Sequence, residues 1–454
     1  MLDLALIGFI AVLLAMGLKR PFLWVLAYIY IDVVAPQKIG WGPIQALPVS
    51  LIAFSAAFGG WLLLDGKHGS RFTLRQGLIV ALLAWCGATT LAAEFPEAAL
   101  TKWDWVWKAL VFAAFLPLTL RTRLRIEAAA LVMVLSIGTI IINGGIKTVF
   151  GGGGYGVLSL LVREDSGLYE GSILSTAAIA TIPLVLWLAR HGTVFRPGWP
   201  VSLFAAGLIF ACLLIPIGTA ARTGLVCIAA LAVLLLRSVR YRFVYAGLGA
   251  LTLLAALPFL PQSYLERMAT ITDYRSDESA STRVQVWSWT FDYVAEHPFG
   301  GGFDAYLGNS FTYDTRTVSG SGNNKMIETE RVTDEARAYH SAYFEVLGEQ
   351  GWPGLALWLW LQALGLWQME RVRRRFGDGE RKASWQWGLA TALQQAQLVY
   401  LVGAVFVGIA YQPFIFMLIG LQCALWSYVR RTESLPRTAR FRRHQAEKPL
   451  PASV

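Results

Sequence analysis

A single histidine marks the place where the chain passes from a polar segment into a long apolar run. His340 lies in "EARAYHSAYFEVLGEQGWPG", residues 335–354, between Tyr339 and Ser341. An imidazole titrates near neutral pH, so it can accept the proton of a hydroxyl nucleophile at that boundary. The alternative is a surface histidine or a residue that caps the following helix. The position makes His340 a candidate general base.

Arg222 lies at a short break between two apolar runs, in "LIPIGTAARTGLVCIAALAVLLL". Pro216 and Gly218 indicate that the first run ends just before it. An arginine costs about 2.5 to 3.5 kcal/mol at the centre of a bilayer and less near the interface. Either its side chain extends to the lipid headgroups, or it contacts an anion inside a cavity.

A second arginine, Arg283, precedes an aromatic pattern at helical spacing. We expect an amphipathic helix over about 282–296, capped by Ser279 or Ser281 and ended by a His-Pro pair and three glycines. Its apolar residues are Trp287, Phe291 and Val294. Arginine in the first turn is unexpected, because that end of a helix favours anions. Either Arg283 is an exposed surface charge, or it and the helix amino terminus bind the same anion.

No motif for metal or nucleotide chemistry accompanies these residues. The sequence has no DxD, HExxH or paired histidines at ligand spacing, and neither a GxxxxGK[ST] loop nor a GxSxG elbow. We therefore predict no metal and no cofactor. Outside a bacterial inner membrane no ATP or nucleotide sugar is available, so an activated substrate would have to be carried on a lipid.

The elements that must position these side chains are membrane helices. The chain has 454 residues, of which 56% are hydrophobic and 15% charged, whereas soluble domains carry about 25% charged residues. Apolar runs long enough to cross a bilayer recur from end to end. We predict an all-α, polytopic membrane helical bundle of about 12 to 13 transmembrane helices with one large periplasmic loop domain.

Basic segments set the orientation. Four of them fall on one side if the spans alternate, and we place that side in the cytoplasm with the C-terminus. They are residues 121–125, 237–242, 370–382 and the tail from Arg430. The net charge of +10 is thus explained by topology and by membrane lipids, and we expect no nucleic-acid partner. An odd number of crossings would put the amino terminus outside, and an even number inside.

Four regions follow from this topology. The first contains ten spans and a periplasmic glycine-rich loop, the second is the periplasmic loop domain, the third holds the C-terminal spans and the fourth is a basic cytoplasmic tail. Their bounds are 1–260 with the loop at 143–172, then 261–340, 341–428 and 429–454. We expect the second half of the loop domain, "TVSGSGNNKMIETERVTDEAR", to be a mobile polar loop.

Two segments resemble the signature of the O-antigen ligase and Wzy-type polymerase superfamily. They are "STRVQVWSWTFDYVAEHPFGGGFDAY" (281–306) and "YHSAYFEVLGEQGWPGLALWLW" (339–360). The helix start "GTAARTGLVC" (218–227) is similar to a third motif, with Ala221 where the family commonly has serine. The asparagine that the family often shows before the seventh span is absent. The resemblance covers the second half of the chain, and the first half matches only as a bundle of spans.

The resemblance implies a metal-independent, inverting glycosyltransferase at the periplasmic face of a Gram-negative inner membrane. Its donor would be a glycan on undecaprenyl diphosphate, and the acceptor of a ligase would be a hydroxyl of lipid A-core. Arg222 and Arg283 would bind the diphosphate, and His340 would act as general base or orient the acceptor. Arg163 and Lys108 lie on the same face by the predicted topology and would add positive charge.

Other acceptors and one other class stay open. Within the superfamily the alternatives are an O-antigen polymerase and a protein O-oligosaccharyltransferase. A transporter or flippase would carry ionisable residues within several spans and paired broken helices. This sequence instead places its charges at the span ends and in one external segment, which favours a transferase of this superfamily over a transporter.

Overall fold

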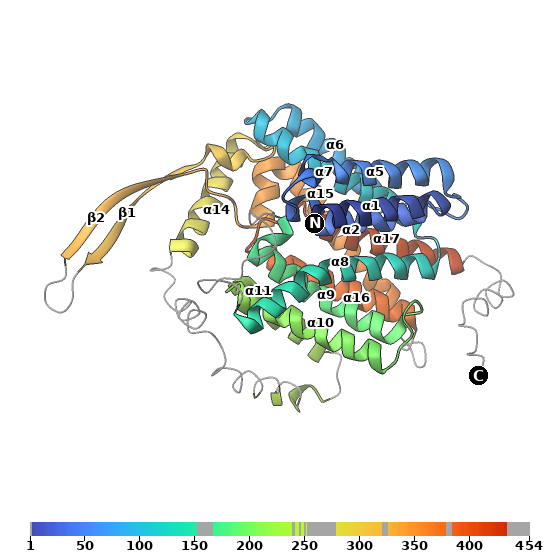
Figure 1. Cartoon of the computed structure of the whole chain (residues 1–454). Helices are drawn as coiled ribbons and strands as arrows, with labels where there is room; N and C mark the ends of the chain where they lie inside the picture. Colours follow the sequence, from blue (N-terminus) through green and yellow to red (C-terminus); the bar gives the residue numbers. More distant parts are fainter. Residues whose placement is uncertain are drawn as a thin grey trace, which may run out of the picture.

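The protein is a bundle of long helices with one β-hairpin projecting from it (Figure 1). The computed structural model describes residues 2–151, 167–237, 241–244, 247–248, 251, 278–319, 326–377 and 384–433. The long helices are α1 (Leu2–Lys19), α2 (Phe22–Val34), α5 (Val49–Gly59), α6 (Leu74–Leu91), α7 (Pro96–Thr119), α8 (Arg123–Phe150), α9 (Gly171–His191), α10 (Trp199–Gly218), α11 (Arg222–Leu236), α14 (Glu278–Glu296), α15 (Ala342–Arg375), α16 (Trp385–Gly403) and α17 (Pro413–Glu433).

Short elements complete the described chain. They are α3 (Pro36–Ile39), α4 (Pro43–Ala46), the π-helix η1 (Gly60–Leu64), the 3-10 turns η2 (Gly167–Tyr169) and η5 (Ala305–Gly308), and strands β1 (Ser310–Ser319) and β2 (Met326–Glu335). α8 continues to Phe150, so a helix occupies the beginning of the predicted glycine-rich loop. The residues expected to form the tenth span, 243–260, lie mostly outside the described residues.

The predicted multi-pass helical membrane fold is confirmed. Among the described residues, seven helices are long and apolar enough to cross a membrane, and the segments Val49–Leu64 and Arg222–Leu236 are shorter apolar helices. The long helices α7, α15 and α16 also pack in the bundle, but they carry buried lysine, glutamate and glutamine side chains. Because lipid offers no hydrogen-bond partners, such side chains must be satisfied inside the protein.

One end of the bundle gathers basic residues. Arg431 at the end of α17 donates from Nη2 to the carbonyl of Arg121 at 3.1 Å. Arg123 donates to the carbonyl of His191 at 2.9 Å and lies 5.2 Å from the Trp385 ring at the start of α16. Residues 121–125 and the C-terminal segment thus lie at the same end of the bundle, as predicted. We call this the basic end.

The opposite end carries His340. α16 begins at the basic end and finishes at Gly403, after which the carbonyl of Ala404 accepts the backbone N–H of Ala342, two residues beyond His340. α1 also starts at the His340 end. The carboxylate of Asp3 accepts the N–H of Gly42 at 3.0 Å, and the same connecting segment approaches η2 through Lys38, whose ammonium lies beside Gly167. α1 therefore starts, and α17 finishes, at opposite ends of the bundle.

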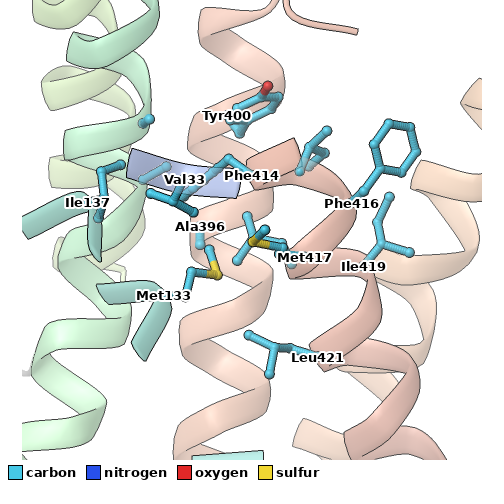
Figure 2. Packing of buried hydrophobic residues seen from close by; sticks show 14 of the residues in the cluster. Val33, Met133, Ile137, Ala396, Tyr400, Phe414, Phe416, Met417, Ile419 and Leu421 are labelled. Carbon is cyan, nitrogen blue, oxygen red and sulfur yellow. The ribbon is translucent and has the colours of Figure 1, made fainter. Parts of the chain in front are cut away.

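The apolar core runs through the whole bundle, and one part of it lies where α2, α8, α16 and α17 meet. Figure 2 shows the packing of these side chains, all of them buried: Val33, Met133, Ile137, Ala396, Tyr400, Phe414, Phe416, Met417, Ile419 and Leu421. Lipid tails are as apolar as these groups, so tight packing and interhelical hydrogen bonds hold such helices together. The core thereby supplies a rigid support for the residues at either end.

A buried polar chain crosses the same bundle. Arg75 of α6 donates to Gln422 of α17 at 2.9 Å, Gln422 donates to Gln397 of α16 at 2.9 Å, and Gln397 donates to Gln362 of α15 at 2.7 Å. All four residues are at most 3% exposed. Because these hydrogen bonds form only in one alignment of the four helices, the chain helps to fix their axial register.

The expectation of a mobile polar loop at residues 317–337 is wrong for the described part, which lies mostly in two strands, while residues 320–325 lie outside the described residues. β1 and β2 pair antiparallel, with Ser310 opposite Glu335 and Ser319 opposite Met326, and the hairpin points away from the helices (Figure 1). The strands are rich in threonine and valine, which favour extended backbone. Polar residues dominate both strands, so the alternation that normally marks a strand is weak in the sequence.

Candidate active site

Helix α14 is fixed across the start of α15. Trp287 donates from Nε1 to the carbonyl of Tyr339 at 2.9 Å. Its ring stacks on Phe344 with centroids 4.9 Å apart and an interplanar angle of 4°, and Phe291 contacts the same ring edge-on at 5.3 Å. The predicted aromatic face of the helix therefore rests on the bundle. Arg283 lies one turn before Trp287 on this helix, near the chain that carries His340.

The predicted start of this helix is wrong. α14 runs from Glu278, so Ser279 and Ser281 lie inside the helix and do not cap it. Arg283 consequently lies in the second turn of the described helix, five residues after Glu278. Glu278 and Ala280 have no helix-breaking tendency, which lets the helix begin earlier. The predicted end is confirmed, because α14 stops at Glu296, immediately before His297-Pro298.

The segment after α14, residues 298–302, which we call the glycine loop, forms backbone hydrogen bonds with α15 at the point where that helix is kinked. The N–H groups of Gly301 and Gly302 donate to the carbonyls of Gly348 and Glu349 at 3.1 and 2.9 Å, and Trp352 donates back to Pro298 at 3.1 Å. α15 breaks at Gly351, where φ is 65° and ψ is −168°. The loop thus satisfies backbone groups that the kink releases.

Glycine is required at both sides of this contact. Gly300 and Gly351 have φ values of +80° and +65°, a region that other residues rarely adopt. A Cβ on Gly300 would lie 2.5 Å from the backbone of Glu349, and one on Gly351 would lie 2.3 Å from the carbonyl of Pro298. Gly351 therefore forms the kink that receives the loop.

A buried lysine joins these elements beneath the loop. Lys102 of α7 places Nζ 2.8 Å from Glu345, 2.7 Å from Glu349 and 3.5 Å from Asp304. The lysine side chain is 12% exposed and that of Glu349 is 0% exposed. We call Lys102, Asp304, Glu345 and Glu349 the Lys102 cluster.

The sequence analysis missed this cluster, although a signal was present. Glu345 and Glu349 are four residues apart, so they share one face of a helix. Lys102 is an ammonium in the predicted vicinity of a membrane span, which by itself suggests a paired site. What the sequence does not provide is the pairing, because 243 residues separate Lys102 from Glu345.

His340 adopts a left-handed backbone conformation with φ of 47°. His340 is exposed as a residue but its imidazole is partly buried, and the helix after it begins at Ala342. Burial lowers the pKa of His340, the positive charges of Arg283 and Arg337 lower this pKa further, and the Glu170 carboxylate opposes them. The imidazole is therefore neutral at neutral pH, which is the form that accepts a proton.

Asn309 holds the chain just before His340. Its side-chain amide donates to the carbonyl of Arg337 at 2.7 Å and accepts the Arg337 N–H at 2.8 Å. The Arg337 guanidinium in turn pairs with Asp334. Asn309 is 1% exposed, so this two-point contact fixes the backbone three residues before the imidazole.

Arg222 lies at the His340 end of the bundle, close to the start of α9. It is the first residue of α11, as predicted. Just before it, Thr219 and Ser175 share a hydrogen bond of 3.0 Å between their hydroxyls. At the start of α9 the Glu170 carboxylate accepts the N–H groups of Ser172 and Ile173. Since the Glu170 charge acts on His340, the starts of α9 and α11 both lie at the His340 end.

Unusual backbone conformations gather at this end. Within the described ranges, the non-glycine residues with positive φ are Ala35, Ala220, Asp304, Ala336 and His340. Each lies in a connection at the His340 end, and none lies inside a helix. Left-handed conformations of such residues are unfavourable and cluster at functional sites. This independent observation points to the same end of the molecule.

Of the two further cations named from the sequence, only Lys108 lies within the described residues. Lys108 pairs with Asp104 at 3.0 Å in α7, about 9 Å further along the helix axis than Lys102. Its partner offsets its charge. Arg163 lies outside the described residues. No group of three or more histidine, cysteine, aspartate or glutamate side chains in the described ranges is arranged to hold a metal ion.

The fold and this site define a multi-pass helical membrane protein with a histidine and arginines at one end. Comparison with known families gives two matches. Residues 205–359 match the O-antigen ligase family, and residues 1–193 match a family of unknown function, DUF5935. Residues 205–359 thus form a region similar to the O-antigen ligase family, which supports the resemblance to the O-antigen ligase and Wzy-type polymerase superfamily. No curated protein matches the sequence.

The ligase match covers the chain from within α10 to beyond the kink of α15. It includes Arg222, Arg283 and His340, together with the glycine loop. Lys102 lies in the other matched region. The Lys102 cluster is thus a direct contact between the two regions.

Proposed function

We propose that this protein is an O-antigen ligase, which transfers a glycan from undecaprenyl diphosphate to a hydroxyl of lipid A-core at the periplasmic face of a Gram-negative inner membrane. The observation that carries the proposal is the docking of α14 on α15, because it brings Arg283 into electrostatic range of His340. The family match supports a lipid-linked glycan donor and a separate acceptor in general.

The reaction needs one base and a cationic site for the leaving group. The acceptor hydroxyl oxygen attacks the anomeric carbon and forms the new C–O bond, while the bond from that carbon to the diphosphate oxygen breaks on the opposite face. The configuration at carbon is thereby inverted. His340 accepts the hydroxyl proton and later releases it to water, and undecaprenyl diphosphate leaves with the bonding electron pair.

The arginines fit the leaving group. As the bond breaks, the diphosphate gains negative charge, which a guanidinium stabilises through paired N–H donors. Arg283 and Arg222, together with Arg337, supply such donors at the His340 end. No metal is needed for this step, because the arginines replace the charge that a divalent ion would supply.

The same charges couple donor binding to base strength. Before the donor binds, Arg283 and Arg337 reduce the proton affinity of His340. A bound diphosphate offsets their positive charge and raises that affinity. The imidazole thus becomes a stronger base when the donor is in place, which limits unproductive protonation of the free enzyme.

The test is transfer in proteoliposomes that contain the purified protein, labelled undecaprenyl-diphosphate glycan, lipid A-core and EDTA. A ligase yields labelled glycan on lipid A-core. In cells, a ligase null keeps the core band of lipopolysaccharide and loses the entire ladder. A null that keeps core plus one repeat identifies a polymerase, and an unchanged ladder with altered glycoproteins identifies a protein O-oligosaccharyltransferase. Either result would overturn the proposal.

Substitution of the arginines supplies a second test. Arg222→Ala and Arg283→Ala should each weaken donor use, whereas the lysine variants should restore it only in part, because an ammonium lacks the planar paired donors. If an arginine-to-alanine variant has the wild-type KM and kcat for the donor, that arginine is not part of the donor site.

A further inference from the structure

We propose that Lys102 is a positioning residue of the transfer site, contributed by the N-terminal region whose family has no assigned function. The inference rests on the proposed function, since it concerns how His340 is held for that reaction. Lys102 acts through Asp304, Glu345 and Glu349, and it does not touch the substrate. It gives the N-terminal region a specific part in the chemistry of the ligase region.

The Lys102 ammonium group is enclosed and therefore unavailable to the diphosphate of the glycan donor. Three carboxylates surround Nζ at 2.7 to 3.5 Å. The rings of Phe303 and Tyr411 lie 5.7 and 5.5 Å from it, a distance at which aromatic faces attract a cation. All three donor positions of an ammonium can be used inside the protein. A role in holding neighbouring elements fits this geometry better than diphosphate binding.

The cluster ties four chain segments together. Glu345 and Glu349 belong to α15, Asp304 follows the glycine loop, and Lys102 comes from α7. The second oxygen of Glu345 accepts the N–H of Ala410 at 3.0 Å, which adds the turn before α17. Glu349 also accepts the N–H of Asp304 at 3.1 Å. Removing the lysine would therefore loosen several connections at once.

The cluster also reaches both sides of His340. On one side, the N–H of Glu345 donates to the carbonyl of Ser341 at 2.8 Å, which fixes the first turn of α15. On the other side, the Tyr339 ring packs against Gly348 and contacts Tyr306 edge-on at 5.7 Å. Tyr306 follows Asp304 by two residues. The residues on both sides of His340 are thus held in place. Ser341 is held by Glu345, a member of the Lys102 cluster, and Tyr339 by Gly348 and Tyr306, which lie close to members of the cluster in the chain.

The charge balance explains why the lysine is required. Without its ammonium, the buried carboxyl groups of Glu345 and Glu349 and the partly exposed one of Asp304 would face one another, and a buried charge that loses its partner is strongly unfavourable. The carboxyl groups would separate or take up protons, and either change would move Asp304 relative to Glu345. Displacement of a catalytic group by about 1 Å can slow a reaction about a hundredfold.

The experiment compares Lys102→Met, Lys102→Arg and the double variant Lys102→Met with Glu349→Gln in the proteoliposome assay. Lys67→Met is the matched control, since Lys67 is exposed in the connection between α5 and α6. Backbone hydrogen exchange of residues 336–342 is measured in each protein, together with the melting temperature. The double variant removes one of the carboxylates left without a partner, so it separates folding from positioning.

We expect Lys102→Met to lower kcat about tenfold or more, with the donor KM within about twofold of wild type. Exchange at 336–342 should accelerate. The double variant should melt closer to wild type yet stay slow, and Lys102→Arg should recover part of the rate. Lys67→Met should match wild type in all measurements.

Two results would overturn the inference. One is a wild-type kcat in Lys102→Met or in the double variant. The other is a loss of kcat with unchanged exchange at 336–342, which would show that the ammonium acts on the substrate. If the wild-type protein forms no labelled lipid A-core, the proposed function fails instead, and the exchange measurement still tests whether Lys102 holds the segment around His340.

Discussion

The indole nitrogen of Trp287 donates a hydrogen bond to the carbonyl of Tyr339, the residue immediately before His340. This contact links the helix that carries Arg283 to the chain segment that carries the candidate base. The parallel stack of Trp287 on Phe344 reinforces it. Two functional groups 57 positions apart in sequence are thereby fixed relative to each other.

Trp287→Phe should separate the hydrogen bond from the ring stack. A phenyl ring retains contact with Phe344 but cannot donate to Tyr339, and such a bond contributes about 0.5 to 1.5 kcal/mol. We expect a three- to tenfold lower kcat/KM, about the equivalent of that energy, and a nearly unchanged melting temperature. Trp360→Phe is the control, since Trp360 is 64% exposed on α15. Equal transfer rates for the two variants would argue against a role for the Trp287 contact.

The glycine loop should tolerate no side chain where it meets the α15 kink. Gly300→Ala and Gly351→Ala each place a methyl group within 2.5 Å of backbone atoms and force an alanine into positive φ. We expect each variant to lose more than about 2 kcal/mol of stability, measured by thermal unfolding in detergent.

Gly207→Ala is the matched control for the glycine variants. It lies in α10 with no atom within 4 Å of the added carbon, so alanine should be neutral or slightly stabilising there. A wild-type melting temperature for Gly351→Ala would show that the kink and the loop do not require this close approach.

The rate of transfer should depend on pH through His340. Its pKa is below the ordinary value of 6.5, so kcat/KM should rise as the pH increases through this lowered pKa and reach a plateau at neutral pH. Arg283→Gln removes a positive charge and should shift the acid limb to higher pH. Glu170→Gln removes a negative charge and should shift it to lower pH.

The same titration affects stability. A histidine whose pKa is lower in the folded state binds fewer protons there than in the unfolded state, so its contribution to stability is complete above the unfolded pKa and is lost as the pH falls from there through the folded pKa. His340→Gln should therefore weaken the acid dependence of the melting temperature.

For the kcat/KM profile, shifts of the acid limb in the same direction for Arg283→Gln and Glu170→Gln would contradict the electrostatic account of this site.

Much of the helical framework could be predicted from the sequence, because long apolar runs leave few alternatives in a bilayer. The start of α11 at Arg222 and the end of α14 before His297 follow from local signals that act within one turn. The meeting of residues 121–125 with the C-terminal segment follows from the alternation of spans. These features depend on residues that are close in sequence or on a rule that applies to the whole chain.

The features that were missed depend on distant pairing. Lys102 meets Glu345 and Glu349 only after α7 and α15 pack, and no local pattern identifies the partner of a lone lysine. The β-hairpin was missed because its strands are polar, and Ser279 and Ser281 were wrongly expected to cap a helix that begins at or before Glu278. The motifs indicated which residues could react, whereas the contacts that position them became apparent only in three dimensions.

The most direct test of the central claim is the single-turnover rate of transfer by His340→Ala in EDTA, with donor binding measured separately. The account predicts a rate at least a hundredfold below wild type, with donor affinity close to wild type and an unchanged melting temperature. His340→Gln should be equally slow, since an amide can orient an acceptor but cannot accept its proton. A wild-type transfer rate in His340→Ala would contradict the assignment of His340 as the base.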